Sequence, residues 1–104
     1  MTPAQHFALL DGSTFFVVAI DNATSQAVGF VTALSDGVNA SFIPLLEVLP
    51  AYQKRGIGST LMSKILEKLD PIVNVDLTCD IPMQSFYERF GMLKSNGMVL
   101  RKYV

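Results

Sequence analysis

One stretch decides the predicted fold: Val48-Leu49-Pro50-Ala51-Tyr52-Gln53-Lys54-Arg55-Gly56-Ile57-Gly58-Ser59. An apolar run stops at Pro50, a polar loop follows, and two glycines precede an amphipathic segment. The first turn of a helix has backbone N–H groups without partners and a partial positive charge. Glycines there let an anion approach the backbone, and Lys54 and Arg55 add formal charge. The stretch therefore predicts a phosphate-binding loop between a strand and a helix.

The spacing of the glycines excludes two common phosphate loops. The pattern GxxxxGK[ST] is absent, and the dinucleotide pattern GxGxxG would need glycine where Leu61 stands. What remains is Gln-x-x-Gly-x-Gly at a strand-to-helix junction.

Periodicity predicts the elements around this loop. Ile57, Leu61 and Ile65 recur every four residues, which indicates a helix over 56–69. The segment 41–49 is almost continuously apolar and predicts a central strand covered on both faces. Residues 1–12 fit a short helix with Pro3 in its first turn. The remaining expected elements are strands over 15–20, 27–34 and 73–79, a helix over 82–90, and a hairpin of 92–94 with 98–104 turning at Asn96-Gly97.

Composition narrows the class of protein. The chain has 104 residues, 50% hydrophobic and 16% charged, which indicates one folded domain over 1–104 and excludes a disordered chain. Its apolar runs are short for a membrane span, and a net charge of −1 gives no electrostatic case for nucleic acid or membrane partners. The single Cys79 and single His6 cannot build a structural zinc site, so no metal is expected. The lone cysteine fits a reducing compartment and a cytoplasmic location.

Two motifs together resemble a known family. Gln53-Lys54-Arg55-Gly56-Ile57-Gly58 is similar to the acetyl-CoA pyrophosphate loop of the GCN5-related N-acetyltransferases (GNAT). Phe86-Tyr87-Glu88-Arg89-Phe90-Gly91-Met92 resembles the second hallmark of that superfamily. The resemblance covers about Phe15 to Val104 and indicates a short member without most of the usual N-terminal helical region.

The resemblance implies a fold and a cosubstrate site. The fold is α/β (α+β), a mixed and mostly antiparallel sheet flanked by two main helices. Its parallel strands 41–49 and 73–79 splay apart to hold CoA. Backbone amides of the loop would bind the pyrophosphate, the strand end would pair with the pantetheine arm, and Asp80 would either contact CoA or cap a helix. The expected cosubstrate contacts are Val48, Leu49, Gln53, Lys54, Arg55, Gly56, Ile57, Gly58, Ser59 and Asp80.

The resemblance also implies two catalytic candidates. Glu47 lies in an apolar strand, where desolvation would raise its pKa and make it a general base, although a purely structural carboxylate is the alternative. The family's better-known base position corresponds to Phe42, which cannot act as a base. Tyr87 matches the tyrosine that protonates the departing thiolate, and its alternative role is packing in the core. Cys79 is expected to be a buried apolar residue, and His6 a surface residue of the terminus.

The expected function is acetyl-CoA-dependent transfer of an acetyl group to an amine of a small molecule or peptide. The alternative is a CoA-binding sensor or interaction module with little catalysis, and a weaker one is another phosphate ligand at the same loop. The apolar residues Phe15, Phe16 and Phe30 are expected to be partly covered by a second subunit, which predicts a homodimer.

Overall fold

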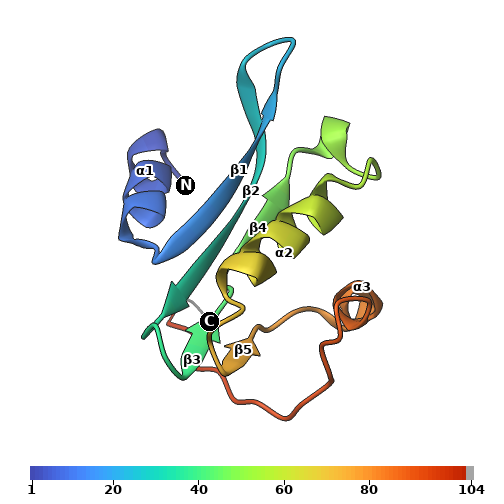
Figure 1. The fold of residues 1–104 in the computed structure, drawn as a ribbon. Helices are drawn as coiled ribbons and strands as arrows, with labels where there is room; N and C mark the ends of the chain where they lie inside the picture. Colours follow the sequence, from blue (N-terminus) through green and yellow to red (C-terminus); the bar gives the residue numbers. More distant parts are fainter. Residues whose placement is uncertain (103–104) are drawn as a thin grey trace.

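The computed structural model describes residues 1–102 and shows a mixed sheet with helices beside it (Figure 1). The helices are α1 (Pro3–Gly12), α2 (Ile57–Lys68) and α3 (Gln84–Glu88), and short 3-10 turns span Pro50–Tyr52 and Ile81–Met83. The strands are β1 (Phe15–Asp21), β2 (Gln26–Ser35), β3 (Ala40–Phe42), β4 (Leu46–Val48) and β5 (Asn74–Asp76). Strand β2 pairs antiparallel with β1, β3 and β4, and β3 pairs in parallel with β5. The predicted mixed, mostly antiparallel sheet with one parallel pair is confirmed.

The strand predicted over 41–49 is not continuous, which corrects the expectation. It is divided into β3 and β4 by residues 43–45, which lie opposite only Thr32 and Ala33 on β2. Three residues therefore lie opposite two, and the one extra residue forms a β-bulge, which bends the strand that carries it. Pro44 stands inside the bulge and has no N–H to give to a neighbouring strand.

The bulge ends the pairing of the parallel strands. Ile43 donates its N–H to the Asp76 carbonyl at 3.0 Å, and no strand pairing joins β4 to β5 beyond that bond in the described residues. The bulge also limits the length of β5. This strand is shorter than the predicted strand 73–79 because its partner β3 has only three residues. The two strand segments therefore separate after Ile43, as the predicted splay requires.

Helix α2 covers one face of the sheet, where it packs against β1, β2 and β4 (Figure 1). The predicted helix over 56–69 is confirmed within a residue at each end. Its apolar stripe supplies Leu61, Met62 and Ile65 to the buried core, where they meet Val31 and Ala33 of β2. This packing fixes the position of the first turn of α2 relative to β4.

Helix α1 confirms the predicted N-terminal helix but is loosely attached. Thr2 and Gln5 form a reciprocal capping box, with Thr2 Oγ accepting from the Gln5 N–H at 3.1 Å. None of its residues is fully buried, and Phe7 is 71% exposed. The helix is therefore held by its connection to β1 and by a few side chains, such as His6 edge-on to Phe30, rather than by a packed face.

The C-terminal part differs most from the sequence prediction. The helix over 82–90 is a 3-10 turn followed by α3, and residues 92–101 have no regular secondary structure. The predicted hairpin is therefore wrong over residues 92–102, and its last two residues lie outside the described part. Asn96-Gly97 favours a turn, but a two-stranded hairpin is marginal without a surface to pack on. Met98 is 100% exposed and Leu93 89% exposed, so this segment has no such surface.

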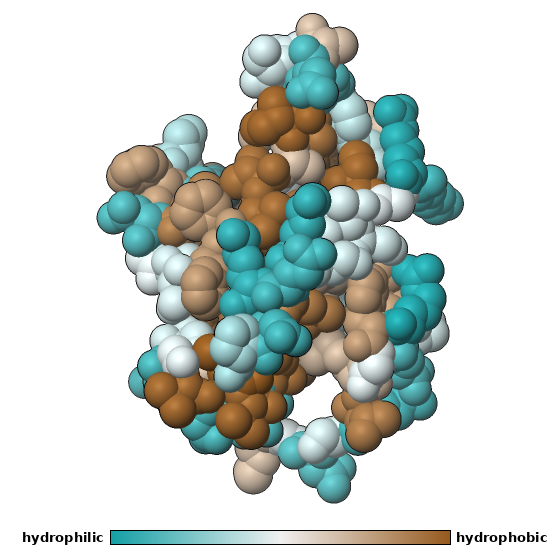
Figure 2. Space-filling model, in the orientation of Figure 1, coloured by the Kyte–Doolittle hydropathy of each residue, from teal (hydrophilic) through white to brown (hydrophobic). Residues whose placement is uncertain are grey.

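Apolar groups remain at the surface of the sheet. Figure 2 shows hydrophobic side chains gathered over the upper half of β1, below a mostly polar hairpin tip. Of the three residues expected to form apolar surface, Phe16 is exposed, whereas Phe15 packs against the core and Phe30 is half-buried. Ile20 and Leu34 are exposed as well. Among residues 1–102, none of the helices combines the length and apolar character that crossing a bilayer requires.

The close approach of β2 and β4 depends on Gly29. A Cβ at this position would lie 3.0 Å from the Glu47 carbonyl oxygen and 3.3 Å from Leu61 Cδ1. We therefore expect Gly29→Ala to lower the free energy of unfolding by about 1–3 kcal/mol, measured by urea denaturation. Gly12→Ala is the control, because nothing lies within 4 Å of a Cβ there. Equal urea midpoints for the two variants would contradict this packing.

Candidate functional site

The first turn of α2 presents free backbone amides. The Thr60 N–H is the first to bond back into the helix, to the Gly56 carbonyl at 3.1 Å. The amides of Ile57, Gly58 and Ser59 precede it, and within the described part of the chain no side chain caps this end. Three N–H groups at the positive end of a helix therefore point at the same place, which is the arrangement that binds an anion.

The loop before α2 has an unusual backbone. Lys54 has a φ of 63° and Gly56 a φ of 82°, both in the left-handed region, with Arg55 between them. Such a conformation turns successive amides toward one side of the chain. Lys54 and Arg55, which directly precede this helix end in sequence, are both exposed cationic residues.

A tyrosine anchors this loop to the sheet. The Tyr52 hydroxyl donates to Asp21 Oδ2 at 2.6 Å, and the Arg55 guanidinium lies 5.2 Å from the centre of the Tyr52 ring. The hydrogen bond lowers the pKa of the Asp21 carboxyl and raises the pKa of the Tyr52 phenol. Both groups therefore keep this pairing at neutral pH, and Arg55 is held against the ring rather than simply solvated.

Strand β4 has one edge open. The Thr32 N–H donates to the Leu45 carbonyl and the Leu49 N–H to the Val28 carbonyl, so alternate residues of this strand point their polar groups at β2. Leu46 and Val48 alternate with these residues, so their backbone N–H and carbonyl groups point away from β2, toward the edge that β5 leaves free. The Val48 carbonyl there accepts the Gln53 side-chain amide at 3.0 Å. Among residues 1–102, no protein group bonds the Leu46 N–H, the Leu46 carbonyl or the Val48 N–H, so these groups are open to a ligand in the splay.

This pattern refines two predicted contacts. The Leu49 N–H is already bound to the Val28 carbonyl, and the Leu49 carbonyl accepts the Tyr52 N–H at 2.9 Å, so Leu49 has no free donor and only one lone pair left for a ligand. The Gln53 N–H already donates to the Pro50 carbonyl at 3.3 Å, so Gln53 is not one of the free amides. The predicted contacts do not include Leu46, although its backbone groups face the open edge of β4.

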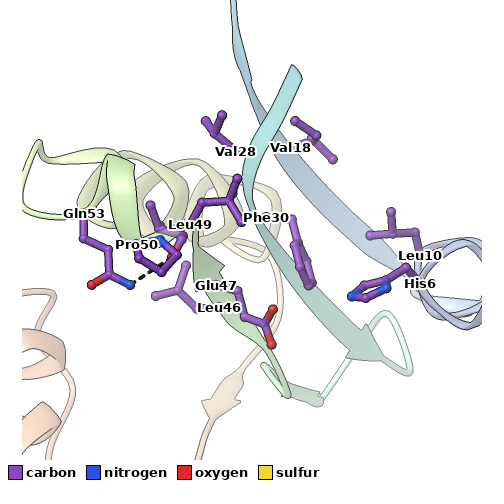
Figure 3. Close-up of a pocket in the computed structure, with 13 residues that line it drawn as sticks. His6, Leu10, Val18, Val28, Phe30, Leu46, Glu47, Leu49, Pro50 and Gln53 are labelled. Atoms are coloured by element: carbon purple, nitrogen blue, oxygen red, sulfur yellow. Dashed lines mark hydrogen bonds between the residues drawn. The ribbon is translucent and has the colours of Figure 1, made fainter. Parts of the chain in front are cut away.

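A pocket of about 620 Å³ opens on the face of the sheet opposite α2 (Figure 3). Phe30 of β2, Glu47 of β4, and His6 and Leu10 of α1 converge on it. Phe30 and Glu47 are paired across neighbouring strands. Its lining residues are His6, Leu10, Val18, Ala27, Val28, Gly29, Phe30, Leu46, Glu47, Val48, Leu49, Pro50 and Gln53.

Comparison with known proteins identifies the family of this chain. The model of the acetyltransferase (GNAT) family matches residues 2–92, most of the chain. The chain belongs to the GNAT family. The resemblance inferred from the two motifs is thereby confirmed. A comparison with curated proteins finds no match.

Solved structures agree with this GNAT assignment. A Deinococcus radiodurans R1 protein with a provisional acetyltransferase assignment is similar at 44% identity and a TM-score of 0.93, over 98% of this chain and 71% of that chain. A GNAT-family acetyltransferase from Streptococcus pneumoniae TIGR4 is similar at 28% identity and a TM-score of 0.82, over 97% and 80%. Glucosamine-6-phosphate N-acetyltransferase from Arabidopsis thaliana shares only the fold, at 13% identity and a TM-score of 0.82, over 97% and 76%.

The second GNAT motif places Tyr87 on α3. Tyr87 is half-buried, contacts the core, and stacks edge-on with Phe86 at a centroid distance of 5.0 Å. Burial raises the pKa of the Tyr87 phenol, and the nearby Cys79 charge raises it further. The Tyr87 phenol is therefore protonated at neutral pH. Cys79 is exposed, so its expected burial is wrong.

The same motif brings a cation that the sequence reasoning missed. Arg89 donates to Ser59 Oγ at 3.3 Å, and its guanidinium lies 5.0 Å from the centre of the Phe86 ring. The motif therefore reaches the first turn of α2 and adds charge beside the free amides. The place of Arg89 within the motif was the available signal.

Three predicted roles change in the structure. Asp80 is exposed and precedes the 3-10 turn, but its side chain makes no capping bond, and only its carbonyl accepts the Met83 N–H at 2.9 Å. Glu47 is exposed, so the desolvation expected from its apolar strand is wrong, because its side chain faces the open pocket. His6 is half-buried in that pocket rather than a surface residue.

The left-handed conformation of Gly56 gives a direct test of the loop. In Gly56→Ala the left-handed backbone costs about 1–2 kcal/mol, and the loop can relieve this strain by leaving its CoA-binding conformation. We therefore expect calorimetry to show about tenfold weaker CoA binding. Gly37→Ala is the matched control, because Gly37 has nearly the same φ, 83°, and a comparably open environment. CoA affinities that fall equally in both variants would show that the effect is general strain and not loss of the loop.

Proposed function

We propose that this chain is an acetyl-CoA-dependent N-acetyltransferase that passes an acetyl group directly to an amine of a small molecule or peptide. The observation that carries the proposal is the open edge of β4 leading, through the Tyr52-anchored loop, to the free amides of α2. Membership of the GNAT family supports the same reading.

The residues present fit CoA. The amides of Ile57, Gly58 and Ser59, with the Arg89 charge beside them, suit a pyrophosphate. The unpaired backbone groups of Leu46 and Val48 suit the amides of a pantetheine arm, which can extend a sheet edge as a strand does. Lys54 and Arg55 add attraction for the phosphates.

Acetyl-CoA supplies the thioester whose carbonyl carbon accepts the amine. Glu47, or a water that it orders, takes the proton that the amine loses as the new C–N bond forms. One of the two free N–H groups of β4 polarises the carbonyl oxygen, and the other remains for the pantetheine arm. Tyr87 gives its phenol proton to the sulfur as the C–S bond breaks. No side chain needs to form a covalent bond with the acetyl group.

A second candidate is a CoA-binding sensor with little catalysis. It is favoured by the exposed Glu47 carboxylate and by Phe42, which stands where the family places its better-known base. The sensor requires CoA binding in calorimetry without turnover of any amine, and no effect of Glu47→Gln or Tyr87→Phe on thiol release.

Assembly and location stay predictions. The exposed Phe16, Ile20 and Leu34 support a homodimer, and a strictly monomeric species in light scattering at micromolar concentration would contradict it.

A cytoplasmic location rests on the lone cysteine alone, and finding the protein outside that compartment in fractionated cells would overturn it.

Two tyrosines separate catalysis from cosubstrate binding. Tyr87→Phe removes the proton donor and is expected to lower kcat by about 100-fold in a thiol-release assay, with little change in KM for acetyl-CoA. Tyr52→Phe is the matched control: it removes the 2.6 Å bond that anchors the loop and is expected to raise KM for acetyl-CoA with kcat nearly retained. A Tyr87→Phe enzyme with unchanged kcat would show that Tyr87 only packs in the core.

A further inference from the structure

We propose that the pocket between α1 and β4 binds the acceptor, and that the acceptor is a primary amine carried on an apolar or aromatic body without phosphate or carboxylate. This inference rests on the proposed acetyltransferase function and names its substrate class. The pocket volume, about 620 Å³, lies within the range of small-molecule sites.

The position of the pocket connects it to the reaction. Leu46, Glu47 and Val48 line it, and these residues form the strand whose free edge faces the splay. A molecule in the pocket therefore contacts the same strand as the thioester proposed for that edge. An amine needs this proximity for direct attack.

The charges of the lining define the amine. Glu47 is the one side chain with a formal negative charge among the described lining residues, and these residues include neither lysine nor arginine. An ammonium group is attracted to Glu47. A phosphate or carboxylate on the acceptor would be repelled by Glu47 and would lose its hydration without a cation in return.

Aromatic and apolar groups define the rest of the acceptor. Figure 3 shows the Phe30 ring between Glu47 and His6. A ring in this place offers its face to a cation or to an aromatic body. Leu10, Val18 and Val28 complete apolar walls around it, which favour burial of a hydrophobic group.

His6 adds a second polar group suited to an amine. Its Nδ1 lies 3.0 Å from the Thr2 carbonyl oxygen, which can only accept, so Nδ1 carries the proton. In the neutral ring Nε2 is then an acceptor, free to receive an N–H from the amine. The ring stands edge-on to Phe30 at a centroid distance of 6.3 Å, which keeps it beside the pocket.

The test compares two amines that differ by one group. Binding of 2-phenylethylamine and of phenylalanine, which adds a carboxylate, is measured by calorimetry on the full chain, with glucosamine 6-phosphate as a phosphorylated amine. We expect 2-phenylethylamine to bind at least tenfold more tightly than either. Equal or tighter binding of phenylalanine or glucosamine 6-phosphate would overturn the proposal.

A pair of variants on one helix locates the binding. Leu10→Lys places a cation in the pocket and is expected to weaken 2-phenylethylamine at least tenfold and to strengthen phenylalanine. Phe7→Lys adds the same charge to α1 outside the pocket lining, where Phe7 is 71% exposed, and should bind both as the unmodified chain does. Identical affinities in the two variants would place the amine elsewhere and overturn the proposal.

Adding acetyl-CoA separates this inference from the proposed function. Binding of 2-phenylethylamine with no thiol release supports the pocket assignment and contradicts the transferase. Thiol release with glucosamine 6-phosphate but not with 2-phenylethylamine supports the transferase and overturns the acceptor class.

Discussion

Pro44 has no backbone N–H to give to a neighbouring strand, and it stands where the segment joining β3 to β4 bends. The Ile43 N–H bond to the Asp76 carbonyl is the last link between the parallel strands. Past it, the one-residue bulge turns β4 away from β5, and in the described residues the Leu46 N–H and carbonyl and the Val48 N–H are left without a strand partner. An exposed sheet edge is normally a liability, and here it lies beside a helix terminus that also has unpaired amides. The two sets of unpaired groups make one elongated site for a molecule that has both amides and phosphates.

The rest of the structure holds these two features in place. The buried stripe of α2 fixes the helix on the sheet, and Gly29 lets β2 approach the Glu47 carbonyl closely enough to keep β4 in register. The loop between them is anchored at two adjacent residues, by Gln53 to the Val48 carbonyl and by Tyr52 to Asp21. Because these anchors do not depend on a ligand, the loop is pre-organised, and binding loses less conformational entropy.

Local patterns in the sequence are sufficient to predict the main helix and its first turn, but not the division of the central strand or the structure of the C-terminal segment. The four-residue repeat of Ile57, Leu61 and Ile65 and the two glycines predicted α2 and its anion-binding turn, because periodicity and backbone freedom are local properties. The division of strand 41–49 was missed, since its apolar composition concealed the effect of Pro44 on pairing. The Asn96-Gly97 turn signal predicted a hairpin that the described residues do not form, because strand pairing needs a packing surface that a turn cannot provide.

Long-range contacts explain the errors at the site itself. Glu47 was expected to be desolvated by its apolar neighbours in sequence, but alternation along β4 turns it to the opposite face from Leu46 and Val48 and into an open pocket. His6 reaches that pocket only because α1 lies beside β2, and Arg89 reaches Ser59 only because α3 lies beside α2. None of these proximities is visible in local spacing.

The central claim is that one ligand spans the open edge of β4 and the first turn of α2. It is tested most directly by following backbone amide resonances of the isotope-labelled chain during titration with CoA. The amides of Leu46 and Val48 are expected to shift together with those of Ile57, Gly58 and Ser59 at a single apparent affinity. Shifts confined to other parts of the chain, or no shifts at saturating CoA, would contradict it.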